Sequence, residues 1–263
     1  MRGVMRLVTA RAGLVPSRPW RFDKSPAGGL PRVRIGHAPL DLGRLDEVLR
    51  AVEGLVTGGQ GGRILLPDVE QVVRAERDEV LRSALATAEL SLAGGPEMIR
   101  AAGRLGVPAL ALEPRTGAQW LPPLAALARE RAWRVVVVAE RPKLSEWAAG
   151  ALRDRYGLLA VGVAAPDVPA DGRGPWVDTL IDRIELTRPD LVWVSMDTPK
   201  QELFCQHAAS RLHGAVLLGV GSAMESLLDG RGGARARGAL RSPWRWLLQR
   251  LAFQRVLAHA RAT

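Results

Sequence analysis

Apolar and polar positions alternate regularly from about residue 32 to about residue 228. Short runs rich in Val, Leu or Ile are typical of buried strands, whereas apolar residues spaced three and four apart indicate helices. This pattern predicts strands at residues 32–35, 63–66, 90–92, 134–139, 158–163, 190–195 and 215–219. It predicts helices at residues 42–56, 69–86, 96–105, 120–132, 142–156, 175–186, 199–212 and 223–228.

Strands that alternate with helices need crossover connections, which place parallel strands side by side and helices over the sheet. The Val-rich run at residues 134–139 is typical of a strand buried on both faces. We therefore expect an α/β fold with a Rossmann-like, mainly parallel sheet and helices on both faces. This domain is expected over residues 31–230, after a flexible basic leader at residues 1–30.

The composition changes sharply after Asp229, because residues 231–263 contain eight arginines and no acidic residue. Ser242 and Pro243 can begin a helix there, with an apolar stripe at positions 244, 247, 248 and 251. One interpretation is a solvated helix that packs on the domain. The lack of acidic residues favours instead an appendage that contacts phosphate or an anionic membrane surface.

The net charge of +10 indicates a polyanionic partner, such as a phosphate ester, nucleic acid or anionic lipid. A single cysteine, Cys205, excludes an internal disulfide framework and is expected to be a buried thiol in its helix. The four histidines lack the spacing of metal ligands, so we expect neither a metal site nor a cofactor. No apolar run reaches the roughly 18 residues that span a bilayer.

Two junctions between a buried strand and a helix stand out, at residues 188–204 and 217–230. Thr198 with Gln201, and Ser222 with Glu225, fit the capping-box pattern of helix starts. Such boxes usually only punctuate helices, but sheets of this class bind ligands where strands end and helices begin. Two neighbouring helix N-termini suit an anion. Lys200 in a first turn indicates bound phosphate, because the helix dipole disfavours an unpaired cation there.

Gly219 and Gly221 also suggest a dinucleotide-binding turn, but the third glycine of that pattern is Met224. The position of this pair near the C-terminus further disfavours a dinucleotide site, because that turn normally opens the first βαβ unit. No phosphate-binding loop of the P-loop type and no paired metal-binding histidines are found.

Three stretches together resemble the WecG/TagA/CpsF glycosyltransferases: RPDLVWVSMDTPKQE at residues 188–202, LLGVGSAMESLLDG at 217–230, and RWLLQRL at 245–251. The likeness is strong from Pro189 to Leu251 and weaker back to Val33. It implies an inverting, metal-independent transfer of an N-acetylmannosamine-like sugar from a UDP donor to a polyprenyl-diphosphate-linked acceptor. The expected place is cytoplasmic, peripheral at the inner face of the cell membrane, in cell-envelope polysaccharide synthesis.

The resemblance also implies roles for individual residues. Gln201 and Glu202 match the Q-E pair near the donor, and Glu225 stands where the family has the Asp of "F-D-F". Arg250 matches the arginine of the C-terminal "E-W-x-x-R-L" that engages diphosphate at the membrane. The expected donor-binding set is Thr116, Gly117, Thr198, Lys200, Gln201, Glu202, Gly219, Gly221 and Glu225, and the expected diphosphate and membrane set is Arg237, Arg245 and Arg250.

The chain departs from the family on the acceptor side. Gly94 stands at the position of the catalytic Asp of "P-D-G", and residues 66–68 (Leu-Pro-Asp) replace "T-x-N". A Gly-Gly pair after the Val-rich strand becomes Ala139 and Glu140, and the arginine of "R-V-T-G" comes one place late, as Arg115. Transfer to a hydroxyl needs a general base, which Gly94 cannot supply.

Three explanations compete. Another carboxylate, Asp68 or Glu97, serves as the base; or the site is rebuilt for a different donor or acceptor; or catalysis is lost and a nucleotide-sugar-binding or scaffold role remains. We favour a divergent transferase because the donor-side motifs are the better preserved. A nucleic-acid binder is disfavoured, since the arginines concentrate at the two ends and no recognition fold appears. A homo-oligomer is compatible with the sequence.

Overall fold

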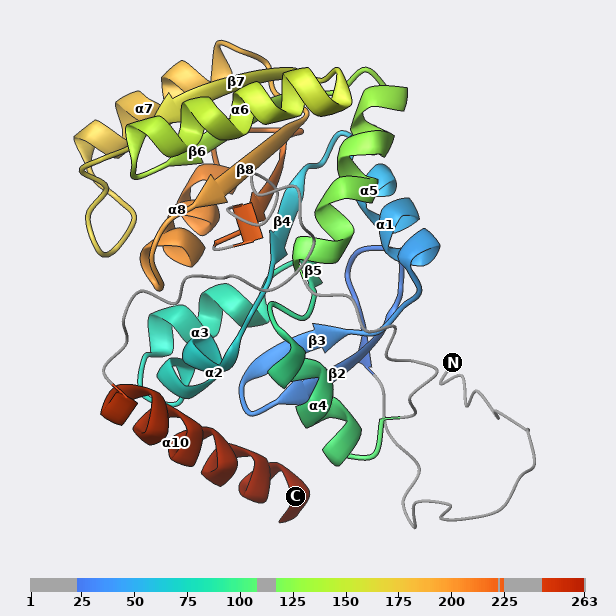
Figure 1. The fold of residues 1–263 in the computed structure, drawn as a ribbon, viewed down its shortest axis with the longest axis vertical. Coiled ribbons are helices and arrows are strands. Elements are labelled where there is room, and N and C mark those ends of the chain that lie inside the picture. Colours follow the sequence, from blue (N-terminus) through green and yellow to red (C-terminus); the bar gives the residue numbers. More distant parts are fainter. Residues whose placement is uncertain (1–22, 108–116, 222, 225–242, 263) are drawn as a thin grey trace.

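The structure is a computed structural model that describes residues 23–107, 117–221, 223–224 and 243–262. Its centre is a six-stranded parallel sheet with the strand order β5-β4-β9-β8-β6-β7 (Figure 1). The strands are β4 (Gly62–Leu65), β5 (Leu90–Ser91), β6 (Arg134–Ala139), β7 (Leu159–Ala164), β8 (Leu191–Ser195) and β9 (Val216–Gly219). The predicted α/β class with a parallel sheet is confirmed.

Helices cover both faces of this sheet. Successive residues of each strand point to opposite faces, so alternate side chains pack against different helices. One face, which includes Val135, Val137 and Trp193, packs against α1 (Leu45–Thr57), α5 (Gly117–Glu130) and α6 (Pro142–Tyr156). The other face, which includes Val136 and Val194, packs against α7 (Pro175–Glu185) and α8 (Lys200–Ala209). Burial on both sides explains why the strand sequences are continuous apolar runs.

A second, antiparallel sheet is formed by β1 (Asp23–Lys24), β2 (Pro31–Ile35) and β3 (Ala38–Asp41). The sequence pattern predicts only the middle strand, and as a member of the main sheet, so this prediction is wrong. A tight turn at Gly36, with φ of 59°, pairs Ile35 with Ala38. Ala27 and Leu30 are buried, so part of the segment predicted as a flexible leader is folded.

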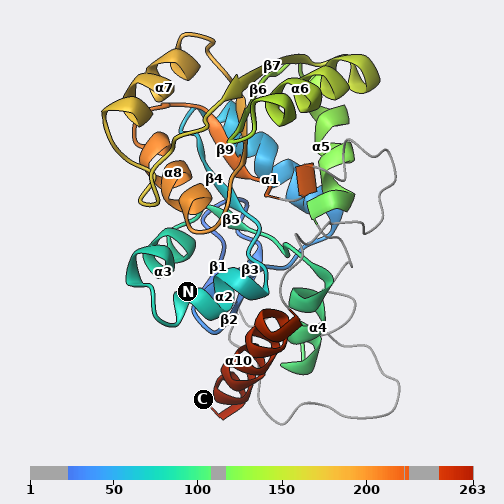
Figure 2. The same cartoon turned by 60° about the vertical axis from the view of Figure 1, so that its left-hand side comes forward.

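Four further helices surround the small sheet: α2 (Val69–Ala75), α3 (Glu79–Ala86), α4 (Pro96–Arg104) and α10 (Pro243–Ala262). The single helix predicted over residues 69–86 is therefore two, because Asp78 caps a new helix by accepting from the Leu81 amide at 3.0 Å. Helix α10 lies beside α2 and α4 (Figure 2). Its Phe253 and Leu257 are buried in the core cluster that contains Ile35.

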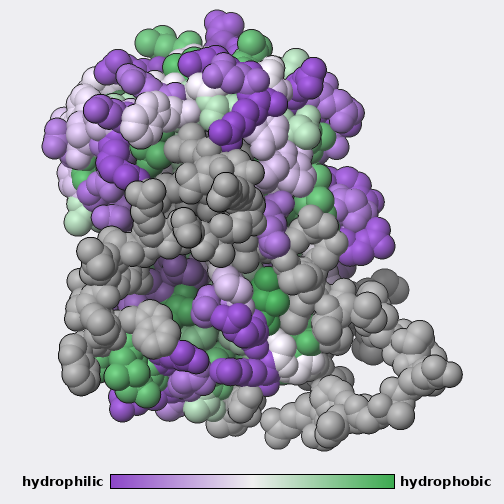
Figure 3. All heavy atoms as spheres, viewed as in Figure 1, coloured by the Kyte–Doolittle hydropathy of each residue, from purple (hydrophilic) through white to green (hydrophobic). Residues whose placement is uncertain are grey.

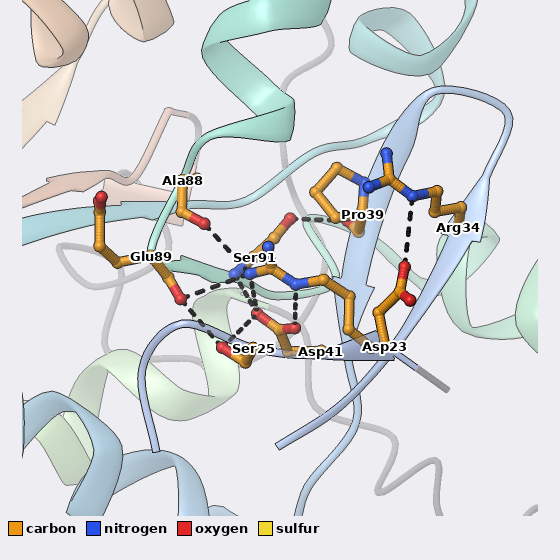
Figure 4. A network of polar contacts seen from close by, with 9 residues as sticks. Asp23, Ser25, Arg34, Pro39, Asp41, Ala88, Glu89 and Ser91 are labelled. Atoms are coloured by element: carbon orange, nitrogen blue, oxygen red, sulfur yellow. Dashed lines mark hydrogen bonds and ion pairs between the residues drawn. The ribbon is translucent and has the colours of Figure 1, made fainter. Parts of the chain in front are cut away.

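A buried ion pair fastens the small sheet to the main one (Figure 4). The Arg32 guanidinium donates from Nε and Nη2 to the two Asp41 carboxylate oxygens, at 2.6 and 2.8 Å. Nη2 also donates to the Ala88 carbonyl at 3.1 Å, and Asp41 Oδ2 accepts from the Ser91 amide at 2.7 Å. These bonds fix where β5 enters the sheet, and so where the loop after β5 stands.

The remaining sequence expectations concern the ends of the chain. Of the helix expected at residues 223–228, only residues 223–224 are described, and they are helical; the first part of the leader lies outside the described residues. Within the residues that the structure does describe, no helix is both long and apolar enough to cross a membrane.

Candidate functional site

Four neighbouring strands, β4, β9, β8 and β6, end at the same edge of the main sheet. The segments that follow them hold the residues named above: Asp68 after β4, Glu140 after β6, residues 196–202 after β8, and Gly221 after β9. Open parallel sheets bind ligands outside the carboxyl ends of their strands. This strand-end edge is therefore the candidate site.

Gln201 joins two of these strand ends. Its side chain is buried, and Oε1 accepts hydrogen bonds from the Gly221 amide at 2.9 Å and the Met196 amide at 3.4 Å. A Cβ atom on Gly219 would lie 2.9 Å from Gln201 Nε2, so glycine at this position makes room for the amide. Gln201, Gly219 and Gly221 therefore lie together, and their role in donor binding stays a prediction.

The predicted capping box at Thr198 is wrong. Helix α8 begins at Lys200, and Pro199 occupies the N-cap position without a side-chain hydrogen bond. Gln201 therefore stands at the second helical position, and its amide bonds to the Gly221 amide across the strand ends instead of to its own N-cap. The local sequence pattern could not show that a better partner comes twenty residues later. Thr198 instead lies beside the Glu202 carboxyl and acts to lower its pKa.

Glu202 is a buried carboxyl with 1% of its surface exposed. Its Oε1 accepts from Gln201 Nε2 at 3.1 Å and from Gln71 Nε2 at 3.2 Å. Burial raises the pKa of Glu202, and the nearby polar groups of Gln71, its own backbone, Gln201 and Thr198, which lower the pKa, only partly oppose this. The buried carboxyl therefore holds its proton more tightly than a glutamate in water.

Lys200 has an anionic partner within the protein. Its Nζ forms an ion pair with Oε1 of Glu140, whose Oε2 accepts from the Asp197 amide at 3.1 Å. This carboxylate offsets the unfavourable position of a cation at a helix N-terminus. The position of Lys200 is therefore no longer evidence for bound phosphate, because Glu140 already supplies the anion near this helix N-terminus.

Gly94 leaves no room for a side chain. A Cβ atom there would lie 2.2 Å from the Leu66 carbonyl oxygen and 2.9 Å from that of Pro67, and the Gly94 amide donates to Pro67 at 2.9 Å. The loop after β5 therefore packs directly against the loop after β4. With this backbone, a carboxylate cannot be carried at the position where the family has its catalytic Asp.

The two substitute carboxylates occupy different surroundings. Asp68 lies at the strand-end edge and caps α2, where Oδ1 accepts from the Glu70 and Gln71 amides at 2.7 and 3.3 Å. Glu97 is half exposed in the first turn of α4 and forms an ion pair with Arg100 at 2.6 Å. The structure connects Asp68 to the residues after β8, through Gln71, and places Glu97 on the surface.

Other predicted residues cannot be placed, since Thr116, Glu225 and Arg237 lie outside the described residues, as does the side chain of Arg245. Gly117 opens α5, and Arg250 is exposed on α10. Their roles stay predictions. In the described residues no group of three or more His, Cys, Asp or Glu is arranged to hold a metal. Cys205 is buried, as predicted.

Sequence reasoning missed two members of the site, Gln71 and Glu140. A signal existed for each: Gln71 stands three residues after Asp68, the spacing of a capping box, and Glu140 directly follows a buried strand. What the sequence could not show is that Gln71 meets Glu202, 131 residues further on.

A comparison with known protein families identifies the family of this chain. Residues 33–229, which are most of the chain, match the family described as "Glycosyl transferase WecG/TagA/CpsF family". A search of curated proteins gives no match. The matched range includes the whole main sheet, β3 and every strand-end segment of the site, whereas β1 and the first two residues of β2 precede it. The chain belongs to the WecG/TagA/CpsF family of glycosyltransferases.

Proposed function

We propose that this glycosyltransferase moves an N-acetylmannosamine-like sugar from a UDP donor to a polyprenyl-diphosphate-linked acceptor in cell-envelope polysaccharide synthesis. The observation that supports the proposal is that Gln201 hydrogen-bonds to the segment after β8, at Met196, and to the segment after β9, at Gly221. Helix α8 begins at this junction, and a helix N-terminus favours a negatively charged ligand.

In the proposed reaction, an acceptor hydroxyl attacks the anomeric carbon on the face opposite to UDP. The new C–O bond forms as the bond to UDP breaks, so UDP leaves with the electron pair and the configuration is inverted. The N-terminus of α8 and Lys200 stabilise the leaving diphosphate, in place of a metal. Lys200 exchanges Glu140 for a phosphate oxygen when the donor binds.

Asp68 is the favoured general base, because it lies at the strand-end edge, whereas Glu97 is paired with Arg100 on the surface. Its carboxylate accepts the proton of the acceptor hydroxyl, a contribution that typically amounts to roughly 10²–10⁴-fold in rate. The cap hydrogen bonds hold this side chain in one orientation.

The lipid-linked acceptor requires an approach to a membrane, and α10 offers a suitable face. Leu247, Leu248 and Leu251 are exposed on this helix, whereas Phe253 and Leu257 are buried against the domain. Figure 3 shows hydrophobic side chains gathered over the first half of α10. An exposed apolar strip with Arg250 and Arg255 close by suits the surface of an anionic bilayer.

A second candidate function, a catalytically silent nucleotide-sugar-binding or scaffold protein of the same pathway, is favoured by one observation. Gly94 has no carboxylate, and the backbone around it leaves no room for the side chain of the family's catalytic aspartate. A silent protein would retain donor binding at the β8 and β9 strand ends without turnover.

One experiment separates the two functions. The full chain is incubated with a panel of UDP-sugars and a short-chain lipid-diphosphate acceptor, beside Asp68→Asn and Glu97→Gln variants. Asparagine also caps helices, so Asp68→Asn removes the base and keeps the cap. We expect turnover that falls at least a hundredfold in Asp68→Asn and little in Glu97→Gln. Saturable UDP binding without turnover would support the silent function, and no UDP binding would contradict both.

A further inference from the structure

A line of side-chain hydrogen bonds connects three strand-end loops. Gln71 Oε1 accepts from the Asp68 amide at 2.8 Å, and Gln71 Nε2 donates to Glu202 Oε1 at 3.2 Å. Gln201 Nε2 donates to the same oxygen at 3.1 Å, and Gln201 Oε1 accepts from the Gly221 amide at 2.9 Å. The loops after β4, β8 and β9 are therefore joined by one continuous line of hydrogen bonds, which runs from Asp68 through Gln71, Glu202 and Gln201 to Gly221.

The orientation of both amides is fixed by their partners. The Asp68 and Gly221 backbone amides can only donate, so the side-chain oxygens of Gln71 and Gln201 must face them. Both NH₂ groups then point at Glu202, which must accept. All three side chains are at least nine-tenths buried, where an unpaired polar group is costly.

Glu202 meets these two donors with a single oxygen. Its Oε2 is buried and has no hydrogen-bond partner among the described residues. An ionised carboxylate with one oxygen buried and unpaired is unfavourable, whereas a neutral acid carries its proton on that oxygen. Burial raises the pKa of Glu202, and the groups that lower it carry no charge. A neutral Glu202 has the shape of a glutamine, with one acceptor and one donor.

We propose that Gln71 and Glu202 are positioning residues for the transfer reaction, and that Glu202 acts as a neutral acid. The line that they form sets the place of the Asp68 loop relative to the loops that bind the donor. This inference rests on the proposed function. A loop displacement of about 1 Å can cost roughly a hundredfold in rate without a lost substrate contact.

The test compares Gln71→Met, which keeps the size of the side chain and removes its hydrogen bonds, with Glu202→Gln, which copies the neutral acid. Gln206→Met makes the same change in α8, outside the line, as a control. For each full-length variant, we would measure the melting temperature, UDP binding, and kcat and KM for both substrates against pH.

We expect Gln71→Met to lower kcat by roughly tenfold to a hundredfold while UDP binding stays near the starting value. Glu202→Gln, which keeps one acceptor and one donor, should lower kcat less than Gln71→Met does and leave the pH profile of kcat unchanged. Full activity in Gln71→Met would overturn the positioning role. Loss of turnover in a Glu202→Gln protein that still folds and binds UDP would overturn the proposal that Glu202 is a neutral acid.

Amide hydrogen exchange separates this inference from the proposed function, because it needs no turnover. UDP bound at the β8 and β9 loops should slow exchange at residues 66–71 of the starting protein, and not in Gln71→Met. If bound UDP leaves exchange at residues 66–71 unchanged in the starting protein, the line does not couple the loops. A protein that shows the coupling without turnover on any UDP-sugar would contradict the proposed function alone.

Discussion

A Cβ atom on Gly94 would lie 2.2 Å from the carbonyl oxygen of Leu66. Real side chains do not approach a backbone oxygen this closely, so any other residue at position 94 must push the β4 and β5 loops apart. The absence of the family's aspartate is thus built into the packing of the main chain. Restoring that aspartate would not restore a base in place.

We therefore predict that Gly94→Ala and Gly94→Asp both destabilise the protein, by about 1–3 kcal/mol or more, as overpacked sites do. Gly95→Ala is the control, because its Cβ would meet only the flexible end of Glu97, at 3.4 Å. Urea unfolding of the three variants measures the difference. A Gly94→Asp protein that is as stable as the starting protein and turns over faster would contradict the steric argument.

The Lys200–Glu140 pair predicts how charge controls donor binding. Glu140→Gln removes the anion that competes with phosphate for Lys200, so UDP affinity should rise several-fold, up to roughly tenfold. Lys200→Met should lower it. Glu146→Gln, an equal charge change on the exposed side of α6, serves as the control. Calorimetric titration with UDP measures all three, and weaker binding in Glu140→Gln would indicate that this carboxylate contacts the donor itself.

The Arg32–Asp41 pair should dominate the stability of the small sheet. Removing one partner leaves a buried, unpaired charge, so Arg32→Met or Asp41→Asn should cost about 3–5 kcal/mol of unfolding free energy. Arg34→Met breaks the neighbouring pair with Asp23, which is exposed, and should cost less than about 1 kcal/mol (Figure 4). If Arg32→Met and Arg34→Met lost the same free energy of unfolding in denaturant, burial would not determine how much each ion pair stabilises the protein.

Glu202 makes stability depend on pH in a defined direction. Its pKa in the folded protein is raised above the ordinary value of 4.5, so the folded state binds the proton more tightly than the unfolded chain. The stabilising contribution is complete below pH 4.5 and is lost as pH rises through the folded pKa. Relative to Glu202→Gln, the starting protein should therefore lose stability from pH 4.5 upward. A stability difference that is constant over this range would contradict the raised pKa.

Helix α10 should separate folding from membrane attachment. Leu248→Glu with Leu251→Glu changes exposed positions, so liposome binding should fall while the melting temperature stays close to its starting value. Phe253→Ala changes a buried position of the same helix and should cost about 3–5 kcal/mol. Co-sedimentation with anionic vesicles gives the readout, and unchanged binding of the double variant would remove the membrane role from this face.

The sequence predicted the main sheet well because its strands are marked locally. The Val run at 134–139 and the helix at 142–156 lie where the pattern puts them. The alternating residues of β2 were predicted as a strand, but its partner β3 was missed because β3 contains Pro39 and joins β2 through a tight turn. In the site, the hydrogen bonds that decide the roles of Gln201 and Glu202 reach 20 and 131 residues along the chain, and no local pattern encodes them.

Gly36 has a consequence for the order in which the chain can fold during synthesis. A Cβ there would lie 2.6 Å from Val256, so the hairpin turn and α10 touch at a point where only glycine fits. The hairpin leaves the ribosome well before Phe253 and Leu257, which complete its apolar core. Ile35 and Val33 therefore stay partly uncovered until α10 has been made, and such exposed apolar surface on a growing chain is prone to aggregation.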